Sequence, residues 1–443
     1  MTPRAEAHAI VLGAGIAGLF TARVLSEFYG RVTVLDRDDL AGAPHEPRRG
    51  VPQSGHAHDF LARGHQISEE LFPGLGDELA AAGAHAGDIA GAMRWIVGGH
   101  PLRKPVAGLG TVTASRPFRE FHLRRRVRAL PGVTVHGDRD VTGFTTAGDG
   151  DAVVGVTVTR RDGTGAEHLP ADLVVDTTGR GSRTPVRLEE LGYGRVEETR
   201  LKVDIGYVTR YVRTPPGAFA GDISVNIVAS ADSPRGGACQ RVDGERTVVT
   251  LYGLLGDHPP LDHDGFLAFA KSLAAPDIHE ILEVSEPLSE PRRYRFPAGL
   301  RRHYERLARF PRGLLVLGDA VCSLNPRYGQ GMTLAALQTT VLRDRLRAAD
   351  GAQPDPAEFF AQLTEQVVGP VWDMTVLSDL SIPGVEGERP PELMQVLELV
   401  GRTQAAATLD DELAVACLKV FGLVDPPAAL LGPEIQERVA ATL

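Results

Sequence analysis

The alternation of apolar and polar positions predicts a strand, a helix and a second strand at the start of the chain. An apolar run at 9–12 is typical of a buried strand, and a helical pattern that runs to about residue 27 follows a glycine-rich turn at 13–18. A second apolar run at 31–35 ends in Asp36. This order of elements is typical of the first βαβ unit of a fold that binds a dinucleotide.

Each glycine of the turn has a separate physical reason. Gly13 permits a tight turn, Gly15 lets the backbone approach a pyrophosphate, and Gly18 lets the helix pack closely on the strand. The helix then offers free backbone N–H groups at Ile16 and Ala17, together with the positive end of its dipole. These features predict a bound dinucleotide. The alternative is a glycine-rich turn with a structural role alone.

An acidic residue ends the second predicted strand. Asp36 lies 18 residues after Gly18, close to the roughly 20 expected for a carboxylate that accepts hydrogen bonds from an adenosine ribose. We therefore assign Asp36 and the neighbouring Arg37 to the cofactor site. The polar, proline-bearing loop at 38–55 is longer than a plain connection, and long loops in compact domains are often functional.

The remaining pattern indicates a second domain inserted into the first. We expect helices at about 58–71, 115–130, 262–274, 277–283 and from 331 onward, and the last hundred residues are expected to be mostly helical. Single strands are expected at 93–97, 111–114, 173–176, 292–296 and 313–317. A small meander of strands is expected at 133–136, 141–146 and 153–160. Long alternating segments from about 197 to 256 are typical of an antiparallel sheet. The fold class is therefore α/β, with a Rossmann-like nucleotide-binding domain at 1–195 and 290–347, an inserted antiparallel substrate-binding sheet at 196–289 with parts of 90–115, and a C-terminal helical region at 348–443.

Composition narrows the class of protein. The net charge is −10 at pH 7, so a general basic surface for nucleic acid is not expected. We interpret the basic run at 124–128 as the solvated face of a helix. Three cysteines without a Cys-x-x-Cys pair favour a reducing compartment. Residues 1–7 lack a signal-peptide core and no apolar run approaches 18 residues, so we expect a cytoplasmic protein with no transmembrane segment.

Three separated motifs give the chain a family resemblance. Gly13–Gly18, Asp176–Gly179 and Gly318–Ala320 occur in the order and spacing of the FAD-dependent monooxygenases with the aromatic-hydroxylase fold, and the resemblance covers about 8–345. Within that group the chain is most similar to the flavin-dependent polyene epoxidases of polyether biosynthesis, of the lasalocid and monensin type. The segments that carry this closer likeness are Arg49–Gln53, His56–His58, Ser115–Pro117, Gly179–Arg183 and Asn325–Met332. Those epoxidases have a longer C-terminal tail, so substrate length or shape can differ.

The resemblance implies particular residues for FAD. Asp319 is expected to bond a ribityl hydroxyl, and the helix that begins near Gly331 and Met332 to aim N–H groups at the pyrimidine edge of the flavin. Arg116 is expected to contact FAD or to form a structural ion pair, and the loop at 49–53 to pass the isoalloxazine or to be an ordered surface loop. The full assignment is Gly13, Gly15, Ile16, Ala17, Gly18, Asp36, Arg37, Arg49, Val51, Gln53, Arg116, Asp176, Gly179, Asp319, Gly329, Gly331 and Met332.

Several other residues are assigned no chemistry of their own. Val321 and Cys322 follow the Gly-Asp-Ala motif where many phenol hydroxylases have a histidine, and Cys322 is interpreted as a buried hydrophobe. His56 and His58 have no partner cysteines or paired acids, so a structural or flavin-proximal place is expected and no metal is implied. The Trp-x-Trp-x-Ile-Pro signature of flavin halogenases is absent from the sequence.

The resemblance implies a monooxygenase that inserts one oxygen atom from O2 through a flavin C4a-hydroperoxide, with no catalytic side chain assigned. An alkene needs no protein base, and no motif marks one, which favours epoxidation of an apolar unsaturated compound in natural-product biosynthesis. Candidate substrate contacts are Tyr207, Tyr211, Val225, Pro326 and Tyr328, although a strand's apolar face is more often core. NAD(P)H is expected to supply electrons directly or through a separate flavin reductase. The alternatives are an aromatic-ring hydroxylase, an FAD-dependent reductase or dehydrogenase, and a flavoprotein that acts as a redox sensor or binding module.

Overall fold

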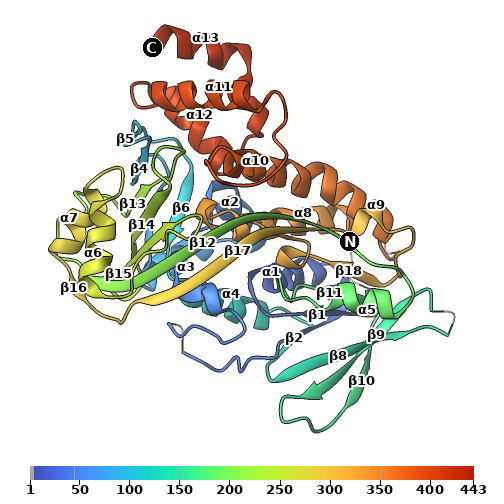
Figure 1. The fold of residues 1–443 in the computed structure, drawn as a ribbon. Coiled ribbons are helices and arrows are strands. Elements are labelled where there is room, and N and C mark those ends of the chain that lie inside the picture. The colour runs from blue at the N-terminus through green and yellow to red at the C-terminus, as the bar shows by residue number, and fades with distance from the viewer. Residues whose placement is uncertain (1–3, 44, 149, 351) are drawn as a thin grey trace.

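The computed structural model describes residues 4–43, 45–148, 150–350 and 352–443. Its first layer is a parallel sheet in the order β18 (Leu314–Val316), β11 (Leu173–Asp176), β1 (Arg4–Leu12), β2 (Tyr29–Leu35) and β7 (Val133–His136) (Figure 1). Helix α1 (Ile16–Leu25) contacts both α4 (Arg116–Arg128) and α8 (Gly331–Ala348). Because all five strands run in parallel, the chain segments that follow them meet at one edge of the sheet, where open α/β sheets bind ligands.

The predicted meander is wrong in one respect. Val133–His136 does form a strand, but it pairs in parallel with β2 at the edge of the first sheet. The antiparallel meander instead consists of β8 (Arg139–Thr146), β9 (Val153–Arg160) and β10 (Glu167–Pro170), the last of which the pattern did not predict. The short helices α3 (Leu75–Ala81) and α5 (Thr184–Glu190) were also not predicted.

A nine-stranded sheet forms the second layer. Its path is β19 (Cys322–Ser323), β17 (Arg292–His303), β12 (Glu197–Arg213), β15 (Arg246–Gly253), β14 (Arg235–Val242), β13 (Ser224–Ile227), β4 (Met93–Val97) and β5 (His100–Pro101), and β16 (Glu286–Pro287) also pairs with β12. Helices α6 (His263–Lys271) and α7 (Asp277–Glu283) pack on one face of it through an apolar cluster. Strand β17 is much longer than the predicted 292–296, because it follows β12 along most of its length. The separate pair β3 (His85–Asp88) and β6 (Gly110–Thr113) completes this half.

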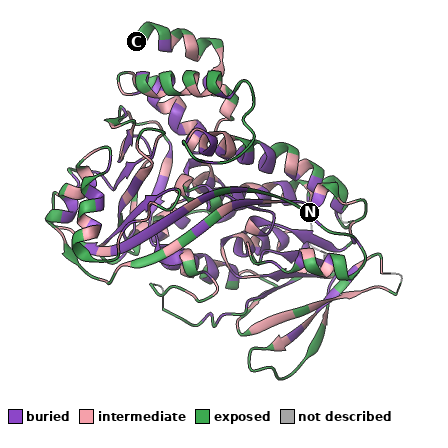
Figure 2. Ribbon diagram, in the orientation of Figure 1, coloured by how far each residue is buried: buried purple, intermediate pink, exposed green. Residues whose placement is uncertain are grey.

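The last hundred residues are mostly helical, as predicted. They form α9 (Pro356–Leu363), α10 (Gly369–Leu380), α11 (Leu393–Ala406), α12 (Asp411–Phe421) and α13 (Pro433–Thr442), and α11–α13 stack at one end of the molecule (Figure 1). Buried residues concentrate in the two large sheets and α8, whereas α11, α13 and the β8–β10 sheet are more exposed (Figure 2). Helix α12 meets α2 (Ala62–Leu71) where the Arg63 N–H donates to the Gly422 carbonyl. Within the described part of the chain, no helix combines the length and apolar character needed to cross a membrane.

Candidate functional site

One large cavity lies between the parallel sheet and the nine-stranded sheet. Its volume of about 910 Å³ is near the upper end of the roughly 300–1,000 Å³ typical of ligand pockets. Its wall includes the glycine turn at one side and side chains of β12–β15 at the other. The cavity therefore joins the predicted dinucleotide site to the predicted substrate sheet.

The glycine turn is shaped as the sequence predicted. Gly13 has a φ of +99°, and a Cβ there would lie 2.9 Å from the carbonyl oxygen of Thr177. A Cβ on Gly18 would lie 1.8 Å from the Gly13 carbonyl oxygen, so Gly18 packs against the turn and does not line the cavity. Gly15 faces open space, since the nearest atom to its Cβ position is Nη2 of Arg48 at 4.0 Å. The backbone at Gly15 is thus accessible to a ligand.

Two helices begin at the cavity. The first turn of α1 lines it with Ile16 and Ala17, and that of α8 with Gly331 and Met332. No described side chain caps the N-terminus of either helix. Uncapped helix N-termini have free N–H groups and a positive dipole end, so both favour a negatively charged ligand group.

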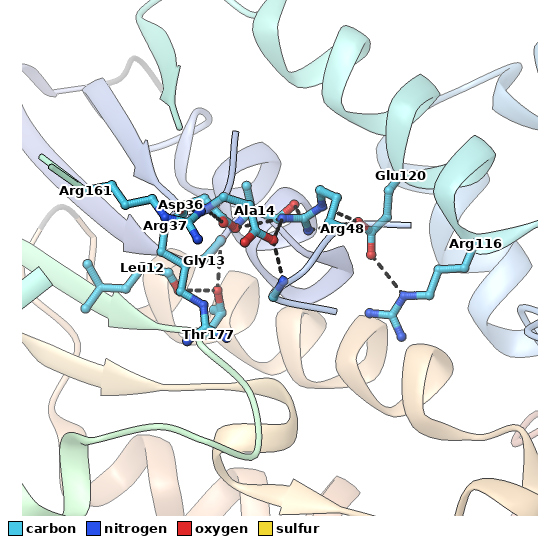
Figure 3. A network of polar contacts seen from close by, with 12 residues as sticks. Leu12, Gly13, Ala14, Asp36, Arg37, Arg48, Arg116, Glu120, Arg161 and Thr177 are labelled. Carbon is cyan, nitrogen blue, oxygen red and sulfur yellow. Dashed lines mark hydrogen bonds and ion pairs between the residues drawn. The ribbon is translucent and has the colours of Figure 1, made fainter. Parts of the chain in front are cut away.

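A buried network of alternating charges connects the turn to α4 (Figure 3). Arg48 donates from Nη1 to Asp36 Oδ2 at 3.2 Å and from Nη2 to Glu120 Oε2 at 2.9 Å. Glu120 also accepts from Nε of Arg116 at 2.9 Å, and Asp36 accepts from the Ala14 N–H at 2.6 Å. Burial alone would raise the pKa of Glu120, but the two guanidinium groups outweigh it and lower that pKa.

The sequence pattern did not identify Arg48, the central member of this network. We assigned Arg49 to the cofactor site, but its side chain is exposed and does not line the cavity, whereas that of Arg48 does. The ion-pair alternative for Arg116 is confirmed, because Arg116 pairs with Glu120. Arg116 also lines the cavity, and its contact with FAD stays a prediction. The spacing of Arg116 and Glu120, one helical turn apart, was the available signal for that ion pair. The basic run at 124–128 is also only partly solvated, because Arg124 is buried.

Most of the other assigned residues line the cavity. Those on its wall are Gly13, Gly15, Ile16, Ala17, Asp36, Arg37, Val51, Gln53, Arg116, Gly179, Asp319, Gly329, Gly331, Met332, Tyr207, Pro326 and Tyr328. Burial raises the pKa of Asp319, although Arg116 and Arg180 oppose this. The expected burial of Cys322 is confirmed. The described residues contain no group of three or more His, Cys, Asp or Glu side chains that could hold a metal ion.

Three further assignments need correction. Asp176 is directed away from the cavity and accepts from the Thr178 N–H at 2.8 Å and the Thr184 hydroxyl at 2.6 Å, so it fixes the turn after β11. Val225 lies in the core between the sheet and α6, because it has the opposite strand parity from the cavity-lining Asn226. Tyr211 shares the parity of Tyr207 but lies beyond the cavity, where the Arg246 guanidinium covers its ring at 5.0 Å.

The sheet wall of the cavity carries aromatic and polar side chains that no motif indicated. Trp95 and Phe421 form an edge-to-face pair with centroids 4.8 Å apart, so α12 contributes to the wall. His56 and His58 also lie on the wall. Burial lowers the pKa of His56 to about 4 and that of His58 to about 3, with Arg292 and Arg116 adding to the respective effects, so both rings are neutral at pH 7.

These histidines predict a pH-dependent stability. Their pKa values are lower in the folded protein than the ordinary 6.5, so only the unfolded chain takes up these protons as the pH falls from about 6.5 towards 4. Each histidine is expected to reduce the free energy of unfolding by up to about 1.4 kcal/mol per pH unit in that range. Urea unfolding at several pH values should therefore give a shallower pH slope for His56→Phe than for the wild type. An unchanged slope would contradict the assignment.

The charge network predicts a second effect on stability. Glu120→Gln leaves two partly buried guanidinium groups without their shared carboxylate, and we expect a loss of about 2–3 kcal/mol in the free energy of unfolding, below the roughly 3–5 kcal/mol of a fully buried pair. Glu398→Gln, at an exposed position of α11, is the matched control and should change stability by less than about 0.5 kcal/mol. Equal urea midpoints for the two variants would show that the network is not structural.

Comparison with solved structures places the fold. The chain is similar to the flavin-dependent brominase Bmp2, with 14% identity, a TM-score of 0.67 and coverage of 98% of this chain and 97% of that one. It is also similar to PqsL, a probable FAD-dependent monooxygenase from Pseudomonas aeruginosa, with 16% identity, a TM-score of 0.64 and coverage of 85% of this chain and 97% of that one. The p-nitrophenol 4-monooxygenase PnpA from Pseudomonas putida DLL-E4 is similar with 15% identity, a TM-score of 0.63 and coverage of 97% of this chain and 98% of that one. At these identities the likeness establishes the fold alone.

Comparison with curated proteins identifies a nearer relative. The sequence matches no family model. It is 37% identical over 431 residues to Protein Rv3254 of Mycobacterium tuberculosis (strain ATCC 25618 / H37Rv), and the match covers 94% of this chain and 90% of that protein. The chain therefore belongs to the same protein family as Rv3254 and has the fold of the flavin monooxygenases.

Proposed function

We propose that the protein is an FAD-dependent monooxygenase that inserts one oxygen atom from O2 into an apolar unsaturated compound. The observation that carries the proposal is the single cavity that receives two uncapped helix N-termini and continues to the aromatic side chains of the second sheet. The fold neighbours include monooxygenases, which supports the reaction class. Electrons would come from NAD(P)H, either directly or through a separate flavin reductase.

The residues on the cavity wall fit FAD. The open backbone at Gly15 and the α1 N-terminus suit the pyrophosphate, with the Arg48 guanidinium beside it, and Asp36 suits the adenosine ribose. Asp319 would accept from a ribityl hydroxyl. The α8 N-terminus, at Gly331, would hold the part of the flavin that becomes negative on reduction.

Bound FAD supplies the oxygen chemistry, and the chain supplies binding, orientation and exclusion of water. Tyr207, Tyr328, Trp95 and Phe421 provide an apolar surface for the substrate. Each buried methylene contributes about 0.8 kcal/mol, so an apolar substrate of several carbons can bind without a charged partner. Epoxidation of an alkene is our first candidate because this attack needs no proton acceptor from the protein.

Asp59 favours aromatic hydroxylation as a second candidate. Its carboxylate lies on the cavity wall and accepts a hydrogen bond from Gln240. Burial raises the pKa of Asp59 to about 6, although Arg119 and Gln240 oppose this. A carboxylate with that pKa could accept the proton of a phenol, whose ring becomes more reactive when ionised. No sequence motif marks this side chain.

The reaction of the reduced protein with O2 tests the proposed function. After anaerobic reduction, mixing with O2 is expected to produce a transient flavin absorbance before oxidised flavin returns, because the aromatic wall of the cavity would limit water at the flavin and the α8 N-terminus would favour its negative charge. Stopped-flow absorbance with a peroxide assay measures this. Immediate return to oxidised flavin with stoichiometric peroxide would instead favour an oxidase or the reductase alternative.

The assignment of Asp319 predicts a loss of FAD affinity. Removal of a carboxylate that bonds a ribityl hydroxyl should cost about 1.5–3 kcal/mol, which corresponds to roughly 10-fold to 100-fold weaker binding in Asp319→Ala. Flavin fluorescence during reconstitution of the apoprotein measures this affinity. Asp373→Ala, at an exposed position of α10, is the control. Full FAD occupancy and unchanged affinity in Asp319→Ala would refute the ribityl assignment.

A further inference from the structure

His56 lies on the cavity wall between two tyrosine rings. The residue is 7% exposed, and the ring centroids of Tyr207 and Tyr294 are 6.1 and 5.5 Å from the centroid of its imidazole. Nδ1 of His56 lies 2.7 Å from the hydroxyl of Thr209. Nε2 has no hydrogen-bond partner among the described residues, although the ring forms part of the wall. One nitrogen of a well-ordered ring is therefore left for a ligand.

The hydrogen bonds behind the ring determine which nitrogen carries the proton. Thr250 Oγ1 accepts from the Ala57 N–H at 3.0 Å and lies 2.7 Å from Thr209 Oγ1. If the Thr250 hydroxyl donates to Thr209, then the Thr209 hydroxyl must donate to Nδ1 of His56, and each of these groups is satisfied. The reverse direction would leave the Thr250 hydroxyl without an acceptor among the described residues. With the first direction, Nδ1 is an acceptor and the proton is on Nε2.

His58 does not offer a comparable group. Its Nδ1–H donates to the His56 carbonyl at 3.0 Å, and its Nε2 accepts from Nη1 of Arg116 at 3.4 Å. Both of its nitrogens are thus used within the protein. Of the two wall histidines, only His56 has an N–H group free to bind a ligand.

We propose that His56 determines substrate specificity by donating its Nε2–H to a neutral carbonyl oxygen, such as that of a ketone, ester or amide, on an otherwise apolar substrate. This rests on the proposed function only in taking the cavity as the substrate site. A carbonyl fits because the group offered is an uncharged donor within an aromatic surface. The wall carries charges of both signs, including Asp59, Arg116 and Arg327, so an anionic comparison is needed to separate a neutral acceptor from an ionic one.

Thr209 is a positioning residue in this arrangement. Its register partner across β12 and β15 is Thr250, which places both hydroxyls on one face of the sheet. Because Thr209 lies behind the ring, its hydroxyl fixes the tautomer and orientation of His56 without bonding the substrate. Loss of this hydroxyl would leave the imidazole free to carry its proton on Nδ1.

Two probes of the same shape test the proposal on the FAD-loaded protein. 2-Acetylnaphthalene carries a carbonyl, 2-isopropenylnaphthalene replaces that oxygen by a methylene, and 2-naphthoate is the anionic comparison. Dissociation constants come from changes in flavin absorbance. The wild type should bind the ketone about fivefold to tenfold more tightly than the alkene, as expected for one hydrogen bond. Equal affinities, no binding of the ketone, or tighter binding of naphthoate would overturn the proposal.

Variants of the wall residues test whether His56 causes the tighter binding of the ketone. His56→Phe keeps an aromatic ring without a donor and should lower the ratio of alkene to ketone dissociation constants to about one, while His56→Gln, which places an N–H near Nε2, should restore most of it. Thr209→Val should lower this ratio of dissociation constants when it is made in the wild-type protein. It should leave the ratio unchanged when it is made in the His56→Phe variant. A preference that persists in His56→Phe would refute the role.

The same experiment separates this proposal from the proposed function. A wild-type protein that takes up no FAD would refute the function, and naphthyl fluorescence would still measure the probe ratio without flavin. If a flavin carbonyl accepts from Nε2, His56→Phe should weaken FAD binding and leave the probe ratio unchanged, which would overturn the substrate role.

Discussion

One buried carboxylate, Glu120, joins the parts of the molecule that form the glycine-turn side of the cavity. It is placed on α4 and accepts hydrogen bonds from Arg116 on the same helix and from Arg48 on the long loop after β2. Arg48 in turn contacts Asp36 at the end of β2. Charges buried in a protein are costly unless each has a partner, so the loop, the helix and the strand end stabilise one another's positions. Arg48 is thereby held beside the glycine turn, where its Nη2 also donates to the Ala14 carbonyl.

Much of the fold was predictable because it depends on local pattern. Apolar runs located β1, β2, β11 and β18, and the positions of α6, α7 and α8 followed from periodicity and turn residues. The errors concern pairing. Nothing local distinguishes a strand that joins β2 in parallel from one that begins a meander, and the length of β17 depends on the strand beside it. Register and partner are long-range properties, which a single sequence does not encode in its periodicity.

The site was predictable to the extent that backbone geometry defines it. Gly13 and Gly18 are required by close approaches that any side chain would block, and Gly15 leaves the backbone open to a ligand, so their spacing alone was informative. The charged side chains were less accessible to prediction. Arg48 and Arg49 are adjacent and chemically identical, and only the path of the loop decides which of them enters the network. Strand parity likewise separated Val225 from the wall, and this could be settled only once the buried face was known.

The face of the sheet that borders the cavity is more polar than an inert hydrocarbon site requires. Thr209, Thr250 and Gln240 are each at most 5% exposed, and buried hydroxyl and amide groups lower stability unless they are paired. Most of this hydrogen-bonding capacity is used within the protein, through the contacts of Thr209 with Thr250 and of Gln240 with Asp59. What remains is a small number of oriented groups within an aromatic surface. Such a wall combines apolar burial, which supplies affinity, with a few polar contacts that select one orientation of a ligand. The polar residues of the wall therefore restrict the orientation of a ligand more directly than its apolar residues do.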